Sequence, residues 1–483
     1  MRRTRTSTLA AGAALAIAMI GAPTAMAAGG STIMVDGDGR ATPASCNDGA
    51  PGSARVTVQG GVNAAQAGDT VLVCPGTYVE QVQIAGKDGL TVRSTRPWKA
   101  TIQAPTDLDA PFIVGIYGAD DVTLQWFNVV TRPTEGCDAP VIGILALAGR
   151  DITIRSNRVR NLGRTLGPCA FTFGIMAGYP LGFSTSSAAL PAGLLPGDLT
   201  TTATIINNAV RDHVGIGIAA VSTLGPTAGG TYGPTRADIL NNSVRYYHLG
   251  STNGDCTPVT STSLSARETR SIRRSISAIP AGPGIGCEAI GIYQGATISD
   301  SPIPGPAGVI RGNRISSGPD AATDLIAGAE PATPAQAIGI LIIDQRHSPG
   351  ASQVLDNLVF RNVFGILAVD AAGVEIRENR SRSAFFGIAV WDTEGAIVRD
   401  NIATDGVVGV IVSDEPFFAS GEAWYVTDDV RFRDNDARGN ADRSCVDDTL
   451  GDGTLGTDNT WIGNLGELDS SDPAGICGGV TPP

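Results

Sequence analysis

The chain is poor in aromatic residues, in histidine and in basic charge. Of its 483 residues only 5% are Phe, Trp or Tyr, and only three are His. Scarce aromatics together with 62 glycines suit coils with many tight turns and a narrow aliphatic interior. Lys and Arg number 34 against 47 Asp and Glu, a net charge of −13. This balance argues against nucleic acid or an anionic membrane as partner, because both require basic surface.

Several catalytic motifs are also missing. The chain has no His-Glu-x-x-His, no P-loop, no Gly-x-Ser-x-Gly and no Cys-x-x-Cys. After the N-terminus no long hydrophobic run occurs, so we expect no membrane span. The first residues combine a basic start, an apolar run over 9–20 and the small residues 25–27. We therefore expect a signal peptide over 1–27 and a secreted protein, by ordinary secretion rather than the twin-arginine route.

The C-terminal half contains a repeat. Gly-apolar segments begin at intervals of 26, 22 and 22 residues, and each ends on an aspartate. A period near 22 predicts a solenoid, in which one repeat is one coil that cannot bury its apolar face alone. Stacked coils would place the four aspartates in register. The segments begin at Gly339, Gly365, Gly387 and Gly409 and end at Asp344, Asp370, Asp392 and Asp414, and earlier copies begin at Gly143, Gly174, Gly215 and Gly291.

A second repeat has the pattern apolar-x-x-Asn-x-apolar. In the regular part each Asn precedes the next repeat glycine by eight residues, as Asn379 precedes Gly387. Stacked Asn amides can bond to one another and to the backbone of a tight turn, so we expect a structural role. The ladder comprises Asn157, Asn208, Asn242, Asn313, Asn357, Asn379, Asn401 and Asn435.

Each coil thus consists of a strand, an Asn turn, a strand, a turn and a Gly-Ile strand. This pattern resembles the right-handed parallel β-helix family of pectate lyases and polygalacturonases. Residues 67–78 are similar to the opening of such proteins, and 459–464 with Cys477 to the closing cap of secreted actinobacterial members. The resemblance implies an all-β, single-domain right-handed parallel β-helix. We expect a cap and first coil over 28–75 with a short helix around 56–65, the β-helix over 76–440, and a C-terminal cap over 441–483.

Long Pro-, Gly-, Ser- and Thr-rich insertions flank the Gly-Ile strand, whereas the Asn turn stays short. Insertions in a solenoid usually gather on its functional side. The Gly-Ile sheet should therefore be the floor of a walled groove, and in the resembled enzymes the corresponding sheet and its loops carry the active site. The insertions cover 180–201, 222–236, 251–287 and 318–336.

Eight cysteines in a secreted chain favour four disulfides over metal-binding thiols. Sequence alone does not fix their connectivity. However, Cys137 and Cys169 occupy almost the same place in adjacent coils, which stack about 4.8 Å apart, within the reach of a disulfide. We therefore expect pairing between consecutive cysteines: Cys46–Cys74, Cys137–Cys169, Cys256–Cys287 and Cys445–Cys477.

Strand alternation sorts the side chains of the Gly-Ile segments into two sets. Ile340, Ile366 and Ile388 should point inward with their partners two residues on, whereas Leu367 and Trp391 should point outward. The outer face is unusually apolar for a sugar-binding floor. If the insertions cover it, any polar site is confined to the strand ends and loops.

The strand ends carry the candidate catalytic residues. Two carboxylates could serve as acid and base, or as acid and nucleophile, in glycoside hydrolysis. Alternatively, Asp370 and Asp392 could bind calcium, which in lyases of the resembled fold neutralises a uronate while an arginine, here Arg346, removes a proton. A third interpretation is that Asp simply suits the turn after a strand. The candidates are Asp344, Arg346, His347, Asp370, Asp392 and Glu394.

Candidate substrate-binding residues lie beside them. Trp391 could stack on a sugar ring or pack under a loop, and Asp414 ends the last Gly-Ile segment. In the insertion 251–287, Arg267, Arg270 and Arg274 share one helical face and could hold an anionic sugar, or form a solvated surface. We expect a monomer that is a secreted polysaccharide lyase or glycosidase, or alternatively a non-catalytic carbohydrate-binding or matrix β-helix.

Overall fold

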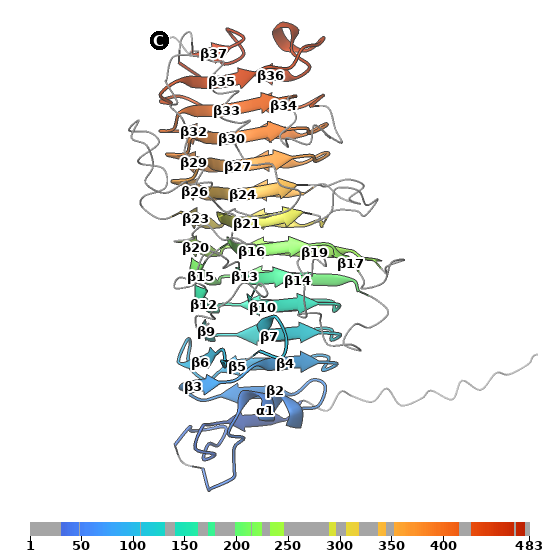
Figure 1. The fold of residues 1–483 in the computed structure, drawn as a ribbon, viewed down its shortest axis with the longest axis vertical. Helices are drawn as coiled ribbons and strands as arrows, with labels where there is room; N and C mark the ends of the chain where they lie inside the picture. The colour runs from blue at the N-terminus through green and yellow to red at the C-terminus, as the bar shows by residue number, and fades with distance from the viewer. Residues whose placement is uncertain are drawn as a thin grey trace, which may run out of the picture.

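The computed structural model is a right-handed parallel β-helix, a single column of stacked coils (Figure 1). Its core runs along the whole column, and ten coils contribute a strand to each of three parallel sheets in turn, while the coils at the two ends contribute fewer. The structure describes residues 30–47, 49–106, 108–130, 141–162, 172–178, 199–213, 215–224, 232–245, 289–295, 306–317, 337–343, 352–414, 427–467 and 470–478.

The first sheet has 13 strands and the second, which follows it within each coil, has ten. The 13-stranded sheet contains β1 (Thr32–Val35), β2 (Thr70–Val73), β5 (Thr91–Ser94), β8 (Thr123–Gln125), β11 (Ile152–Arg155), β14 (Thr201–Ile206), β19 (Thr235–Leu240), β22 (Val309–Arg311), β25 (Gln353–Leu355), β28 (Glu375–Arg377), β31 (Ile397–Arg399), β34 (Arg431–Arg433) and β36 (Thr460–Ile462). The 10-stranded sheet contains β3 (Gly76–Val79), β6 (Ala100–Gln103), β9 (Asn128–Val130), β12 (Arg158–Leu162), β15 (Ala209–His213), β20 (Ser243–Arg245), β23 (Arg314–Ser316), β26 (Leu358–Phe360), β29 (Arg380–Arg382) and β32 (Ile402–Thr404).

The third sheet holds the Gly-Ile strands and has 12 members. It contains β4 (Val82–Ala85), β7 (Phe112–Tyr117), β10 (Val141–Leu147), β13 (Thr172–Ala177), β16 (Gly215–Val221), β21 (Ala289–Gly295), β24 (Ala337–Ile343), β27 (Phe364–Val369), β30 (Phe386–Trp391), β33 (Val408–Ser413), β35 (Arg443–Asp447) and β37 (Ser471–Asp472). Outside the three sheets lie the antiparallel pair β17 (Thr223–Leu224) and β18 (Tyr232–Gly233), helix α1 (Val58–Ala64) and the 3-10 turn η2 (Thr454–Gly456).

The predicted asparagine ladder is confirmed as a buried column. Each amide nitrogen donates to the Oδ1 of the next Asn at 2.8–3.3 Å and to a backbone carbonyl of a preceding coil. Each backbone N–H also donates to the next Oδ1, as Asn379 does to Asn401 at 2.9 Å. The structure extends the ladder to Asn464, which accepts from Asn435. The residue before each Asn has a positive φ, as in Ser156 and Asp356, so the chain turns sharply there.

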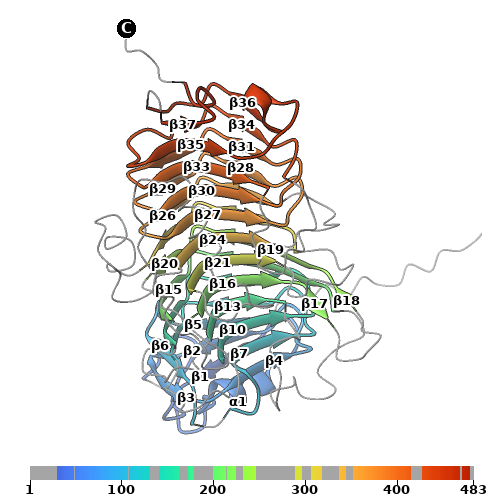
Figure 2. The same ribbon diagram turned by 45° about the horizontal axis from the view of Figure 1, so that its top comes forward.

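The predicted alternation of the Gly-Ile strands is confirmed as well. Inward residues such as Ile366 and Ile388 belong to the aliphatic core of the column. Outward residues such as Leu367 and Trp391 belong to a second, separate buried cluster on the outer face of the same sheet. The 12-stranded sheet is therefore apolar on both faces (Figure 2 shows its strands stacked in register).

The repeat glycines are explained by the next coil. A Cβ added at Gly365 would lie 2.4 Å from the carbonyl oxygen of Gly387, and one at Gly387 would lie 2.5 Å from that of Gly409. Contacts this short leave no room for any side chain. One expectation was wrong: Gly217, not Gly215, occupies this column, because Thr172 pairs with Gly215. The run Gly215-Ile216-Gly217-Ile218 repeats the motif twice, so the pattern alone selected the wrong register.

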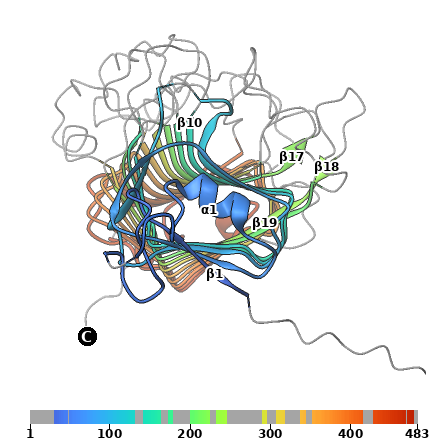
Figure 3. The same cartoon turned by 90° about the horizontal axis from the view of Figure 1, so that it is seen from below.

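The two ends of the column are closed in different ways. Helix α1 lies within the predicted range and across the first coil (Figure 3), with its N-terminal Val58 and Gln59 N–H groups donating to the Glu80 carboxylate at 2.7 and 2.8 Å. At the C-terminal end, the ring of Trp461 stacks on that of Phe432.

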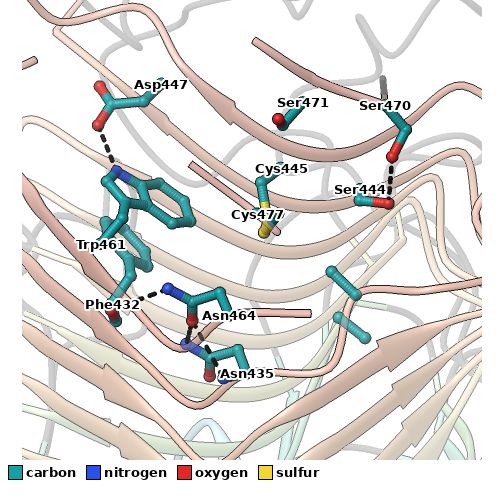
Figure 4. Close-up of a disulfide and its surroundings, with 12 residues drawn as sticks. Phe432, Asn435, Ser444, Cys445, Asp447, Trp461, Asn464, Ser470, Ser471 and Cys477 are labelled. Atoms are coloured by element: carbon teal, nitrogen blue, oxygen red, sulfur yellow. Dashed lines mark hydrogen bonds between the residues drawn. A yellow bond between two sulfur atoms is a disulfide. The ribbon is translucent and has the colours of Figure 1, made fainter. Parts of the chain in front are cut away.

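Two of the expected disulfides are confirmed. They join Cys46 to Cys74 and Cys445 to Cys477, with Cα–Cα distances of 5.7 and 6.0 Å (the second appears in Figure 4). The pairs Cys137–Cys169 and Cys256–Cys287 and the predicted signal peptide over 1–27 lie outside the described residues. Within the part of the chain that is described, no helix is long and apolar enough to cross a membrane.

The ladder predicts a large stability effect at Asn379. Replacing it by Ala would leave the Val354 carbonyl and the Asn357 N–H without their buried partners. We expect Asn379→Ala to lower the free energy of unfolding by about 3–5 kcal/mol in chemical denaturation. The exposed Arg382→Ala in the same coil should change it by less than about 0.5 kcal/mol. Equal effects of the two substitutions would contradict a structural role for the ladder.

Candidate functional site

Two of the predicted catalytic aspartates occupy equivalent places in adjacent coils. Asp370 follows β27 and Asp392 follows β30, and the residues before them, Val369 and Trp391, are register partners. Their side chains are only 6% and 2% exposed. Both residues have positive φ, 51° and 44°, a conformation that Asp tolerates better than most residues. The turn geometry by itself therefore accounts for an aspartate at each of these positions.

The other two described carboxylates of the predicted site are exposed. Asp414 follows β33 in the next coil, and Glu394 lies two residues after Asp392 on the turn into the 13-stranded sheet. There Glu394 forms backbone bridges with Ala372 below and Asp428 above, so its position is fixed by the stacking. Only these two of the four carboxylates can meet a substrate without rearrangement.

Trp391 lies in the apolar layer on the outer face of the 12-stranded sheet. Its side chain is 0% exposed and meets Phe364 and Phe386 edge to face, with ring centroids 6.0 and 6.1 Å away. The two phenylalanine rings stack on each other at 5.0 Å. This arrangement favours packing over stacking on a sugar, because no face of the indole is open.

The remaining predicted residues lie outside the described part of the chain. They comprise three catalytic candidates and the three arginines of the insertion. The insertions 251–287 and 318–336 lie outside it completely, as do residues 180–198 of the first insertion and 225–231 of the second. Their roles stay predictions: Asp344, Arg346, His347, Arg267, Arg270 and Arg274.

A buried carboxylate near the C-terminal end was not anticipated from the sequence. Asp447, at the end of β35, accepts a hydrogen bond from Trp461 Nε1 at 2.7 Å (Figure 4). It also accepts from Thr449 Oγ1 at 2.7 Å and from Asn459 Nδ2 at 3.2 Å. The donors come from segments 2 to 14 residues further along the chain. Because every oxygen is engaged, Asp447 is a structural anchor for the cap.

Around this anchor the end of the sheet gathers further acids. Desolvation raises the pKa of Asp458 above its ordinary value, and the negative charges of Asp428 and Asp414 raise it further. A carboxyl whose pKa is raised in this way suits a proton donor better than an ordinary aspartate does. Asp414 thus connects the predicted row of strand-end carboxylates with the acids of the cap.

The same residues do not by themselves form a metal site. Within the described ranges, no group of three or more His, Cys, Asp or Glu side chains is arranged to hold a metal ion. Calcium prefers six to eight oxygen ligands. A calcium ion at Asp370 and Asp392 would therefore need further oxygen donors, and calcium binding there stays a prediction.

Comparison with known proteins identifies no family. No protein-family model and no curated protein matches the chain. Among solved structures, it is similar to the A-module of the mannuronan C-5 epimerase AlgE6 from Azotobacter vinelandii, with 15% identity, 85% of this chain and 88% of that chain covered, and a TM-score of 0.39.

Two other solved structures show a comparable likeness. One is a mannuronic acid specific polysaccharide family 6 lyase from human gut microbiota, with 12% identity, coverage of 78% and 77%, and a TM-score of 0.40. The other is the GH136 lacto-N-biosidase of Eubacterium ramulus, with 11% identity, coverage of 92% and 65%, and a TM-score of 0.43. These similarities are weak and the three activities differ. The parallel β-helix assignment therefore rests on the three sheets themselves.

Substitution of Trp391 distinguishes a role of its indole in packing from a role in stacking on a ligand. Because the indole is fully buried against two aromatic rings, we expect Trp391→Ala to lower the free energy of unfolding by about 3–5 kcal/mol. The exposed Trp98→Ala should cost far less. Thermal and chemical denaturation would measure both. If Trp391→Ala left stability unchanged, the indole would be held for a ligand and not for packing.

Replacing Asp458 and Asp436 should change the stability of the protein in opposite directions at neutral pH. The pKa of Asp458 is raised, so its ionised form is disfavoured in the folded state, and Asp458→Asn should stabilise the protein at neutral pH. That gain should vanish as pH falls below the unfolded-state value near 3.9. Hydrogen bonds from Arg438 lower the pKa of Asp436, so Asp436→Asn should destabilise at neutral pH, and its cost should disappear as pH falls through the folded-state pKa.

Denaturation across about pH 2–8 would measure both variants. The same sign for the two substitutions at neutral pH would contradict this electrostatic assignment.

Proposed function

We propose that the protein is extracellular and acts on polysaccharide at the edge of the 12-stranded sheet where its strands end. The supporting observation is the second apolar layer on the outer face of that sheet. Because this face is buried, polar chemistry is confined to the strand ends, where carboxylates recur coil after coil. Two disulfides are compatible with an extracellular location.

The proposed reaction is glycoside hydrolysis with a carboxylate pair. Retaining glycosidases need carboxyl groups about 5 Å apart and inverting ones about 6.5–9.5 Å. Adjacent coils of a β-helix lie about 4.8 Å apart, so neighbouring and alternate coils supply both spacings. Glu394 and Asp414 are the exposed members, and we assign them the proton-transfer roles. Asp370 and Asp392 then serve beneath them as turn residues that fix the edge.

A lyase reaction remains the second enzymatic form of this proposal. It would use Arg346 as base, with calcium at Asp370 and Asp392. Both forms place the reaction at the same edge. They differ in product, because a lyase leaves an unsaturated sugar and a hydrolase leaves a new reducing end.

A non-catalytic function is favoured by one specific observation. Asp370, Asp392 and Trp391 are buried, so three of the predicted site residues serve the architecture. A rigid β-helix with an inert sheet edge would be an extracellular carbohydrate-binding or matrix scaffold. Such a protein would bind polysaccharide without changing it.

The test is a panel of neutral and uronic polysaccharides with the purified protein. Ultraviolet absorbance would detect unsaturated products, and reducing-end assays would detect hydrolysis. We expect Glu394→Gln and Asp414→Asn each to lower the rate about 100-fold or more, because each removes a proton-transfer group. The matched controls are Glu378→Gln and Asp434→Asn, exposed carboxylates that each precede a ladder asparagine, and both should retain full activity.

The outcomes separate the alternatives. Binding without product would establish the scaffold and exclude the enzyme. Full activity of both Glu394→Gln and Asp414→Asn would show that the site lies elsewhere.

A further inference from the structure

The outer face of the 10-stranded sheet is basic. Its strands contain seven arginines and a single acidic residue, Asp212, although the whole chain is acidic. The strands form the column that runs from β3 to β32 in Figure 1. Because Val159, Val210 and Val244 point into the core, the residues that flank them point outward. We call five of these arginines the basic face: Arg158, Arg160, Arg211, Arg245 and Arg314.

Three members of the basic face are stacked directly on one another. Arg160 pairs in register with Arg211, and Arg211 pairs with Arg245, in three successive coils. Neighbouring strands lie about 4.8 Å apart. Like charges directly opposite each other in a sheet are destabilising. A column of three guanidinium groups therefore carries a repulsion that something must offset.

No described carboxylate offsets it. Among the described residues, none of the five arginines of the basic face forms an ion pair. In addition, the Nε of Arg245 is buried and has no hydrogen-bond partner. The basic face thus has unused donors and uncompensated charge.

The 13-stranded sheet contains a comparable column of stacked arginines, but there the charges are neutralised by carboxylates. Arg377, Arg399 and Arg433 are also stacked in three successive coils. Each pairs with a carboxylate: Arg377 with Glu375 at 3.1 Å, Arg399 with Asp400 at 2.8 Å, and Arg433 with Asp434 at 2.9 Å. The fold can therefore neutralise such a column internally. On the basic face it does not.

An aromatic side chain lies beside the basic face. Trp98 is 39% exposed, and its indole N–H donates to the carbonyl of Ser156 at 2.7 Å. The guanidinium of Arg158 lies over the Trp98 ring, 3.8 Å from its centre. An indole fixed beside a row of cations combines an apolar surface for a sugar ring with positive charge for its acid group.

We propose that the basic face binds an acidic polysaccharide, with its carboxylates held by the arginines of successive coils. Arginine fits this ligand because its planar fork binds a carboxylate through two parallel hydrogen bonds. The polysaccharide nature of the ligand rests on the proposed function. The surface is distinct from the strand-end edge of the 12-stranded sheet, so the basic face holds the polymer and does not act on it.

The test compares polygalacturonate with its fully methyl-esterified form, which keeps the sugar and removes the charge. Binding would be measured by calorimetry at low salt, where charge attraction is strongest. We expect Arg160→Gln/Arg211→Gln/Arg245→Gln to weaken polygalacturonate binding at least about tenfold. The matched control is Arg377→Gln/Arg399→Gln/Arg433→Gln, which makes the same change in net charge and should bind as the wild type does. Arg211→Gln alone, a milder change, provides a second variant if the triple variant fails to fold.

Several results would overturn the proposal. These are equal loss in the control triple, equal binding of the methyl ester, or binding of duplex DNA as tight as that of polygalacturonate. Activity on short oligosaccharides, measured in the same variants, separates this proposal from the previous one. We expect the basic-face variants to keep that activity, whereas Glu394→Gln and Asp414→Asn should lose it and keep polygalacturonate binding.

Discussion

The buried amide ladder is the constraint on which the rest of this structure depends. A polar amide inside an apolar column is costly unless its donors and acceptor are all used. Here each Asn donates its backbone and side-chain N–H groups to the next Asn and accepts the same two bonds from the Asn before it. A coil that slipped by one residue would therefore leave buried groups unpaired in the coils on both sides. The ladder thereby fixes one corner of every coil from Asn157 to Asn464. In these coils the strands on either side of this corner are held in register by it.

The features that repeat were predictable, and those that do not repeat were not. The 22-residue period, the asparagine column and the inward and outward sides of the Gly-Ile strands follow from short-range pattern, because each coil obeys the same steric rules. The error at Gly215 has the same origin, since two Gly-Ile pairs in succession satisfy the pattern equally well. The bonds of Asp447 could not be predicted because its donors come from irregular segments of the cap.

In the candidate site, too, the repeating feature was predictable and the non-repeating one was not. Sequence reasoning placed four aspartates in register, and the pairing of the preceding strands confirms this for Asp370, Asp392 and Asp414, whereas Asp344 lies outside the described residues. It did not predict that two of the three would be buried, since burial depends on how much of the outer face is covered. Trp391 shows the same limit. An outward direction was correct, but outward on this sheet means into a second apolar layer and not into solvent.

Net charge proved a poor guide to any single surface. The net charge of −13 governs how the whole protein attracts or repels a charged molecule at long range, whereas a bound polymer contacts only one face. In this fold the three outer faces differ: one is apolar and buried, one pairs many of its arginines with carboxylates, and one leaves stacked arginines uncompensated. The repulsion within that last face acts against folding, and the core and the amide ladder are strong enough to hold it. Later coils carry carboxylates on the asparagine turn, Asp400 and Asp434, and these pair with arginines of the 13-stranded sheet. The coils of the basic face have Ser156, Asn207 and Asn241 at the equivalent position, so they present no carboxylate there. A column that remains charged, in a fold that neutralises a comparable column elsewhere, is best understood as a surface kept open for an anion.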